Sequence, residues 1–325
     1  MLTLLIVLAL IFNFLNGFHD SSNIVATIIF SRAMHPRAAL YLTAIAEFIG
    51  PFIFGVAVAE TIGAGIVNPT AVTPDVIVAA LLSAIAWNIL TWLLGIPSSS
   101  SHALVGGLVG AVWASVGLGD VQIAGIIKVL LALFLSPILG FIAGFLITRL
   151  IFFLARNASL RINWWFKRGQ VLTGVGLALS HGANDAQKSM GIMTLGLIAA
   201  GQLSEFEVPF WVIASSAAAM SLGTSFGGWR LIKTLGGKFF KIRPVDGFAT
   251  QISSASVIMG AALLGGPAST TQVVSSSILG VGTAERPNKV RWGVAGSIVL
   301  TWVLTIPANI FLAWALYWVI RLIPG

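Results

Sequence analysis

The sequence lacks cysteine and is poor in charge. Only 9% of its 325 residues are charged, whereas 57% are hydrophobic. Without cysteine, a disulfide framework, a thiolate zinc site and cysteine catalysis are all excluded. Soluble proteins carry about 25% charged residues, and disordered chains have low hydrophobicity, so the chain fits neither class. The composition therefore predicts a polytopic membrane protein.

Basic residues are absent from the first part of the chain. Arg32 is the first of them, and the apolar run at 1–12 leads directly into a polar cluster at 13–23. A secretory signal carries a basic region before its apolar run, so we expect no cleaved signal peptide.

Apolar segments recur along the whole chain. A helix needs about 20 mainly apolar residues to cross a bilayer. Segments of this kind lie at about 2–31, 38–59, 76–96, 98–117, 122–154, 171–200, 208–229, 247–265, 268–283 and 291–320. Those at 98–117 and 268–283 are short and rich in Gly and Ser, and each is either a single crossing or part of a re-entrant hairpin. The pattern predicts an all-α polytopic membrane protein with about ten membrane segments.

The few charges are unevenly distributed. Fifteen of the 18 basic residues lie at 32–37, 149–168, 230–243 and 286–291. The other connections carry acidic residues, namely Glu60, Asp75, Asp120, Glu205 and Glu207. Because Lys and Arg gather in cytoplasmic loops, this alternation predicts that the basic connections are cytoplasmic and that both termini lie outside. The net charge of +8 is then a topology signal, and we expect no nucleic-acid partner.

The two halves of the chain resemble each other at four landmarks in the same order. The landmarks of the first half are 17–20, 50–63, 97–101 and Pro137, and their counterparts are 182–185, 223–236, 267–271 and Pro307. This duplication predicts a first transmembrane repeat at 1–155, a basic cytoplasmic link at 156–170 and a second repeat at 171–325. Five segments in each half is an odd number, so the second repeat enters from the opposite face. Inverted-topology repeats of this kind are typical of secondary transporters, although channels use them too.

Ionisable residues at membrane depth usually have a function, because an unpaired charge there is unfavourable by several kcal/mol. The candidates are Asp20, Glu47, Asp185 and Lys188. In both copies of the first landmark, glycine precedes a polar residue and a carboxylate, which suggests a broken helix whose freed carbonyls suit a small cation. The alternative is that these side chains only hydrogen-bond a neighbouring helix. For Glu47, a coupling role and a pairing role stay equally open.

Two proline-led runs of hydroxyl residues form the second pair of polar features. They lie at 97–102 and 267–272, and each continues into a Gly-rich apolar segment. Proline suits a first helical turn and Ser or Thr caps it, so each run predicts a helix N-terminus near the membrane interior. Free N–H groups and the positive end of the helix dipole make an anion site there, although plain capping is the alternative. His102 and His181 are either proton relays or structural histidines.

An enzymatic interpretation rests on one motif. The residues 223–227 fit G-x-S-x-G, the nucleophile-elbow pattern. That pattern requires a strand–turn–helix context, whereas this copy ends an apolar segment. We therefore expect no enzyme.

These motifs together resemble the inorganic phosphate transporters of the PiT type. The resemblance covers the duplicated signature at 16–23 and 181–188, the two hydroxyl runs, and the motif at 227–236. It implies a dimeric secondary symporter that imports inorganic phosphate, as the free anion or a metal-phosphate, with H⁺ or Na⁺ and without another cofactor. The long domain that eukaryotic members insert between the repeats is absent, which implies a compact prokaryotic form in the cell membrane.

The resemblance also assigns roles to residues. The phosphate-binding residues would be Ser99, Ser100, Ser101, Ser269, Thr270, Thr271, Asn184 and Gln272. The coupling-ion or proton site would comprise Asp20, Asn23, Asp185, Lys188 and Glu47, with Asp20 and Asp185 as possible ligands of Na⁺.

One residue departs from the family pattern. Sodium-coupled members tend to repeat an Asn-Asp-x-x-Asn-like signature in both halves, and here Lys188 stands where the counterpart of Asn23 belongs. At i,i+3 from Asp185 its ammonium can pair with that carboxylate. Our hypothesis is that Lys188 replaces one cation, which leaves proton coupling or a single sodium. A carrier of the same fold for sulfate, and a channel, are the remaining alternatives.

Overall fold

The computed structural model describes residues 1–68, 72–117, 119, 121–159 and 161–322. Asp120, one of the acidic loop residues, lies outside these ranges. The helices are α1 (Leu2–Phe30), α2 (Pro36–Phe54), α3 (Ala57–Ala64), α4 (Pro74–Leu94), α5 (Ser100–Val116), α6 (Ile123–Leu154), α7 (Ile162–Ala199), α8 (Phe210–Phe226), α9 (Trp229–Gly237), α10 (Pro244–Leu263), α11 (Thr270–Glu285) and α12 (Trp292–Leu322), with a short 3₁₀ helix at Pro287–Lys289. An isolated bridge between Val67 and Val121 is the only β-type pairing within the described ranges. The prediction of an all-α fold is confirmed.

The helices are long and apolar enough for a multi-span membrane protein. Within the part of the chain that the structure describes, five helices meet the length and composition of a membrane span: α1, α2, α4, α6 and α12. The pair α8 and α9, bent by 70° at its break, makes a sixth if it is one span. Length and composition therefore establish five or six of the predicted membrane segments. The longest helix, α7, carries the polar stretch 181–188 in its second half.

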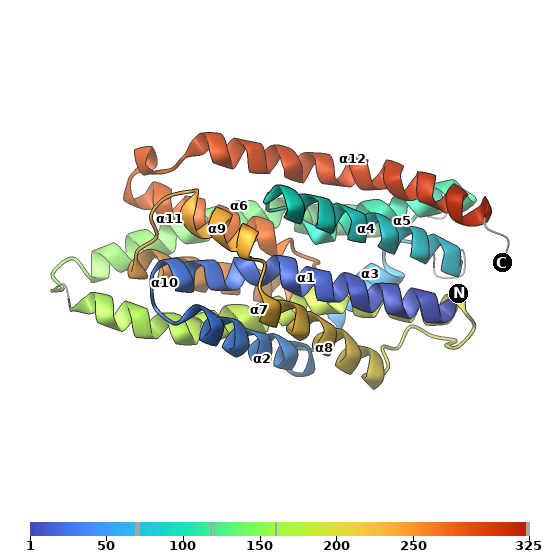
Figure 1. Ribbon diagram of the computed structural model, residues 1–325, viewed down its shortest axis with the longest axis horizontal. Helices are drawn as coiled ribbons and strands as arrows, with labels where there is room; N and C mark the ends of the chain where they lie inside the picture. The colour runs from blue at the N-terminus through green and yellow to red at the C-terminus, as the bar shows by residue number, and fades with distance from the viewer. Residues whose placement is uncertain (69–71, 118, 120, 160, 323–325) are drawn as a thin grey trace.

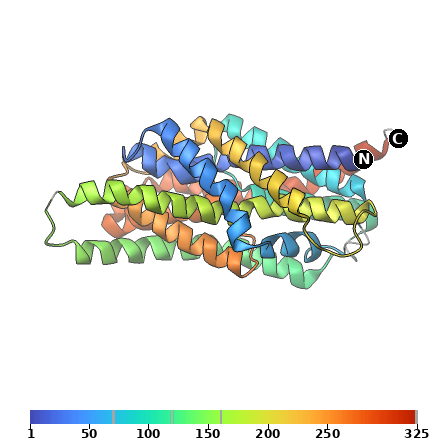
Figure 2. The ribbon, with the colours of Figure 1, turned by 90° about the horizontal axis from the view of Figure 1, so that it is seen from below.

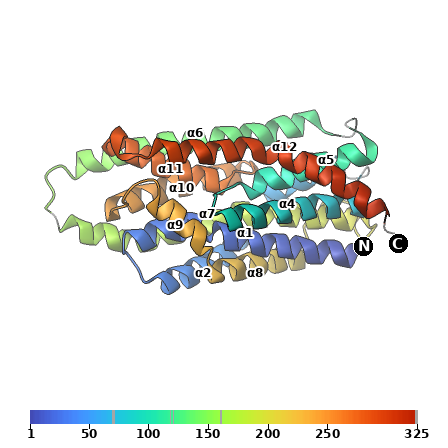
Figure 3. The ribbon, with the colours of Figure 1, turned by 45° about the horizontal axis from the view of Figure 1, so that its top comes forward.

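The two short apolar segments are arms of hairpins that turn inside the molecule. Helices α4 and α5 enter from the end where the chain begins, and α10 and α11 enter from the opposite end (Figures 1 and 3). The two turns touch, because Ser101 Oγ donates a hydrogen bond to the backbone oxygen of Ala268 at 3.3 Å. The hydroxyl residues at 98–101 and 269–271 are at most 2% exposed.

Helices of the first half pack against helices of the second half in matching pairs. Helix α1 lies against α8, and α2 lies against α7. Likewise α5 lies against α12, and α6 lies against α11. Each pair joins a helix of one half to the sequence counterpart of its own neighbour.

The prediction of helix breaks beside Asp20 and Asp185 is wrong. Both α1 and α7 are continuous α-helices through these positions. The glycines serve close packing: a Cβ on Gly17 would overlap the backbone of Met220 in α8, and one on Gly182 would overlap the backbone of Glu47 in α2. The actual breaks lie at Gly55 and Gly227, both with φ near the left-handed region (80° and 75°) that glycine tolerates.

The connections separate by charge, as the sequence predicts. The α1–α2, α6–α7, α9–α10 and α11–α12 connections lie at one end, whereas the start of α1, the α7–α8 connection and the end of α12 lie at the other (Figures 1 and 2). Every basic cluster falls in the first group. Part of the predicted link at 156–170 is helical, because α7 begins at Ile162. The basic residues mark this connection but carry no information on where its helix starts.

Candidate functional site

Local sequence explains how the hydroxyl runs come to begin helices inside the molecule. Gly95 and Gly265 each adopt φ 67°, a left-handed conformation that lets the preceding arm stop and turn. Four residues later in each hairpin, Ser99 and Ser269 are extended N-cap residues. The Ser99 Oγ accepts a hydrogen bond from the backbone N of His102 at 3.2 Å. The helix N-terminus predicted in each run is therefore present, and the helices begin at Ser100 and Thr270, after the prolines rather than with them.

The hydroxyls of the α11 start contact both carboxylates of the duplicated signature. Thr270 Oγ1 lies 2.9 Å from Asp185 Oδ2 and 3.2 Å from Asp20 Oδ2. Thr271 Oγ1 donates to Asp20 Oδ1 at 2.9 Å. At the α5 start, Ser100 Oγ donates to Asn16 Oδ1 at 2.6 Å. The fold thus brings residues that are 250 positions apart into one buried site.

Histidines complete the carboxylate cluster. His181 Nδ1 lies 2.6 Å from Glu47 Oε1, and its Nε2 lies 3.2 Å from Asp185 Oδ2 and 3.7 Å from Asp20 Oδ2. His19 Nδ1 lies 2.9 Å from Asp20 Oδ1. Asp20, Asp185 and His181 each offer a ligand atom, and these atoms lie within 4.8 Å of one another, so this buried group can hold a cation.

The contact between Glu47 and His181 bears on an alternative that the sequence left open. Glu47 faces a polar group on an adjacent helix, His181 of α7. His19 was not singled out from the sequence, and His181 was considered as a proton relay or a structural histidine but not as a partner of both carboxylates. The available signal was proximity along the helix, since His19 adjoins Asp20 and His181 precedes Asp185 by one turn.

Lys188 is fully buried and fully hydrogen-bonded. Its Nζ donates to Asp185 Oδ1, to Ser101 Oγ at 2.5 Å and to the backbone oxygen of Ala268 at 2.9 Å. Its counterpart in the first half, Asn23, donates from Nδ2 to Thr271 Oγ1 at 3.0 Å. The amide oxygen of Asn23 has no hydrogen-bond partner among the described residues.

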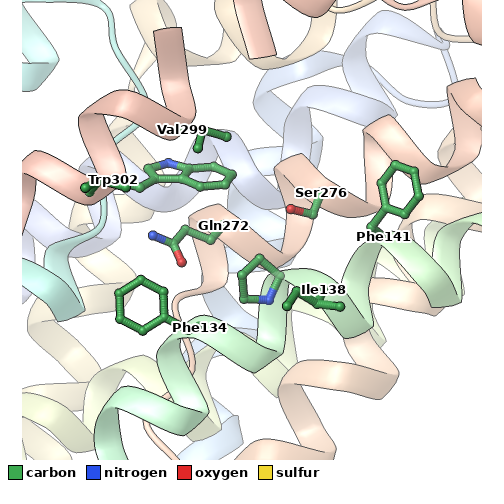
Figure 4. A pocket seen from close by; sticks show the side chains of 9 residues that line it. Phe134, Ile138, Phe141, Gln272, Ser276, Val299 and Trp302 are labelled. Atoms are coloured by element: carbon green, nitrogen blue, oxygen red, sulfur yellow. The ribbon is translucent and has the colours of Figure 1, made fainter. Parts of the chain in front are cut away.

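Two predicted phosphate-binding residues, Asn184 and Gln272, have other hydrogen-bond partners than the carboxylates among the described residues. Asn184 Nδ2 donates to the backbone oxygen of Gly266 at 3.1 Å. Gln272 Nε2 is 3.5 Å from His102 Nε2, and the side chain lines a separate, mainly apolar cavity of about 370 Å³ between α6, α11 and α12. Figure 4 shows Gln272 there between Phe134 and Trp302. Because successive residues on a helix are rotated by about 100°, Gln272 faces away from the site that Thr270 and Thr271 face.

The G-x-S-x-G motif has no catalytic context. Ser225 lies in the last turn of α8, and its Oγ donates to the backbone oxygen of Leu222 at 2.7 Å. No strand precedes it in the described part of the chain, so the strand–turn–helix of a nucleophile elbow is missing.

Comparison with known proteins agrees with this arrangement. The model of the phosphate transporter family matches residues 16–313. The chain belongs to the phosphate transporter family. It is therefore a transporter rather than an enzyme, and the resemblance found in the sequence is confirmed.

Similar proteins span nearly the full length of this transporter. A probable low-affinity inorganic phosphate transporter of Rhizobium meliloti (strain 1021) is 46% identical over 306 residues, covering 94% of this chain and 92% of that protein. One of Bacillus subtilis (strain 168) is 45% identical over 327 residues, covering 99% and 98%. Among solved structures, a protein described as "The sodium-dependent phosphate transporter" matches with a TM-score of 0.89 and 27% identity, covering 99% of both chains.

Proposed function

We propose that this phosphate transporter is a secondary symporter, which imports inorganic phosphate together with H⁺ or Na⁺ by alternating access. The observation that carries the proposal is the meeting of two helix N-termini, from hairpins that enter at opposite ends, beside buried Asp20 and Asp185. Similar proteins named as inorganic phosphate transporters support the choice of substrate.

The site combines groups that attract an oxyanion with groups that require a cation. Helix N-termini carry partial positive charge and free N–H groups, which favour phosphate, and the Ser99–Ser101 and Ser269–Thr271 hydroxyls add polar contacts. The carboxylates of Asp20 and Asp185 would repel a bare anion. A proton, a sodium ion or the metal of a metal-phosphate must therefore accompany it, and the sodium-dependent structural neighbour favours Na⁺ as one such partner.

An inverted repeat would supply the alternation between two open states. The matching helix pairs, the two hairpins from opposite ends and the paired left-handed glycines support this architecture. If the hairpins re-enter rather than span, the first half crosses the membrane once with α1, once with α2 plus α3, and once with α6. The number of crossings is then still odd. The second half, from 171 to 325, is then inverted relative to residues 1–155.

We further assign the protein to the cell membrane of a prokaryote as a homodimer. The basic connections face the cytoplasm and both termini face outward, by the positive-inside rule. The dimer rests on the family resemblance.

Counterflow in proteoliposomes tests this function. Purified protein should exchange labelled phosphate across the bilayer with saturation, and unlabelled phosphate should compete far better than sulfate. Imposing a pH gradient and a Na⁺ gradient separately should show that at least one of them drives accumulation. Non-saturating flux would indicate a channel, and better competition by sulfate would indicate a sulfate carrier.

A further inference from the structure

We infer that Lys188 is a tethered cation: its ammonium permanently fills one of two equivalent cation positions, so that one coupling ion fewer travels with each phosphate. This inference rests on the proposed symport and specifies how the site divides its positive charge between the chain and imported ions.

The surroundings of the ammonium are those of a small hard cation. Its three acceptors are a carboxylate oxygen of Asp185, a hydroxyl oxygen of Ser101 and the backbone oxygen of Ala268. They come from α7, from the α5 start and from the turn before α11, and such oxygens are the ligands that hard cations prefer. A lysine ammonium has three N–H donors, so all of them are used. The side chain is 0% exposed, which leaves no room beside it for bulk water.

The equivalent position in the first half repeats one of these contacts without the charge. The spacing from Asp20 to Asn23 equals that from Asp185 to Lys188. Lys188 reaches Ser101 in the α5 start, and Asn23 reaches Thr271, the counterpart of Ser101 in the α11 start. One contact therefore occurs twice, once with an ammonium and once with an amide.

The amide leaves oxygen atoms where the ammonium supplies charge. Asn23 Oδ1 is buried and has no partner within the described ranges, and Thr271 Oγ1 lies 2.9 Å from Asp20 Oδ1. A buried polar atom without a partner normally has one in the working protein, either an ion or a water molecule. The first-half position is thus left for a mobile cation, whereas the second-half position carries its own.

The consequence concerns the charge of the empty carrier. A buried carboxylate that is paired with a resident lysine needs no imported cation to be tolerated in the membrane. Asp185 is compensated in this way in every state of the transport cycle that keeps the pair. Asp20 has the His19 and His181 imidazoles beside it but no lysine, so it is the carboxylate that depends on a transported ion.

The experiment counts bound sodium ions. Equilibrium binding of ²²Na⁺ to purified protein in nanodiscs is compared between the wild type, Lys188→Asn and Lys233→Asn, the last being a control at an exposed lysine of α9. We expect at most one Na⁺ per protomer for the wild type and the control, and one more for Lys188→Asn. The thermal midpoint of Lys188→Asn should also rise with NaCl relative to KCl by more than that of the wild type, because ligand binding to the folded state stabilises it.

Two results would overturn the inference: two or more Na⁺ bound to the wild type, or no additional Na⁺ bound to folded Lys188→Asn. If that variant does not fold, the wild-type count decides alone. Phosphate counterflow by the same wild-type preparation separates this inference from the proposed function. Failure of counterflow contradicts the symport, whereas normal counterflow with two sodium ions bound contradicts only the role of Lys188.

Discussion

At the residue scale, Asp20 and Asp185 share the Thr270 hydroxyl and the His181 imidazole but differ in their remaining partners. Thr270 Oγ1 lies within hydrogen-bonding distance of both carboxylates, 3.2 Å from Asp20 and 2.9 Å from Asp185. Beyond it, Asp20 contacts the Thr271 hydroxyl and His19, whereas Asp185 pairs with the ammonium of Lys188. Equivalent positions in the sequence therefore have different electrostatic surroundings, and substitutions at them should have different effects.

Asp185→Asn should destabilise the protein more than Asp20→Asn does. Removing one partner of a buried ion pair destabilises a protein by about 3–5 kcal/mol, because the other charge stays buried without compensation. Asp20→Asn leaves no resident lysine unpaired and serves as the matched control. Thermal unfolding of both variants in the same detergent measures the difference. Equal midpoints for the two variants would contradict the pairing of Lys188 with Asp185.

The sequence predicts which residues belong to the site better than it predicts their contacts. Asp20, Asp185 and the hydroxyl runs stand out because each is polar at membrane depth and occurs twice. The sequence does not say which helix neighbours which, so the approach of Glu47 to His181 follows only from the packing of α2 on α7. Gln272 shows the same dependence on packing, since its run is recognisable from the sequence but the separate cavity that its side chain lines is not.

At the element scale, close packing between the halves explains why α1 and α7 stay unbroken. Glycine in a helix is unfavourable by about 1 kcal/mol relative to alanine, which is why glycine beside a carboxylate suggests a break. In membrane proteins, small residues also let helix backbones approach closely. A sequence cannot distinguish the two uses, because the approaching backbone comes from the other half of the chain.

Alanine substitutions at two glycines of α7 separate these uses. Gly182→Ala should lower the thermal midpoint and the folded yield, because its Cβ would overlap the backbone of Glu47. Gly176→Ala, in the same helix, meets no atom within 4 Å and should be neutral or stabilising by up to about 1 kcal/mol. Size-exclusion profiles and unfolding curves measure both effects. A tolerated Gly182→Ala would show that α2 and α7 are less closely packed than the structure has them.

At the scale of the whole molecule, the distribution of basic residues and the positions of the chain ends define the same axis, which runs from one end of the molecule to the other. The basic connections gather at one end, and the start of α1 and the end of α12 gather at the other (Figures 1 and 3). This axis follows from sequence alone, because fifteen of the 18 basic residues gather in four regions and the acidic connections lack them. The turning of the hairpins inside the molecule does not follow, since a short apolar segment suits a crossing and a hairpin arm equally.

Labelling of single cysteines tests the direction of that axis. Because the chain contains no cysteine, each introduced thiol is the only one. In intact cells, a membrane-impermeant maleimide should label Ser204→Cys, in the α7–α8 connection, at once. It should label Asn157→Cys, in the α6–α7 connection, only after the cells are permeabilised. Both positions are exposed on the protein, so the reverse pattern would mean that the protein has the opposite orientation.

The nearness of the start of α1 to the end of α12 means that the order of the halves in the chain is not imposed by the fold (Figures 1 and 2). A short linker could join these ends on one side of the membrane, and the α6–α7 connection could be opened on the other side. The resulting circular permutant would begin with the lysine-bearing half and keep every helix crossing in its original direction. The permutant would change the order of the halves but keep their difference in charge at Asn23 and Lys188. The effects of these two features could then be measured separately.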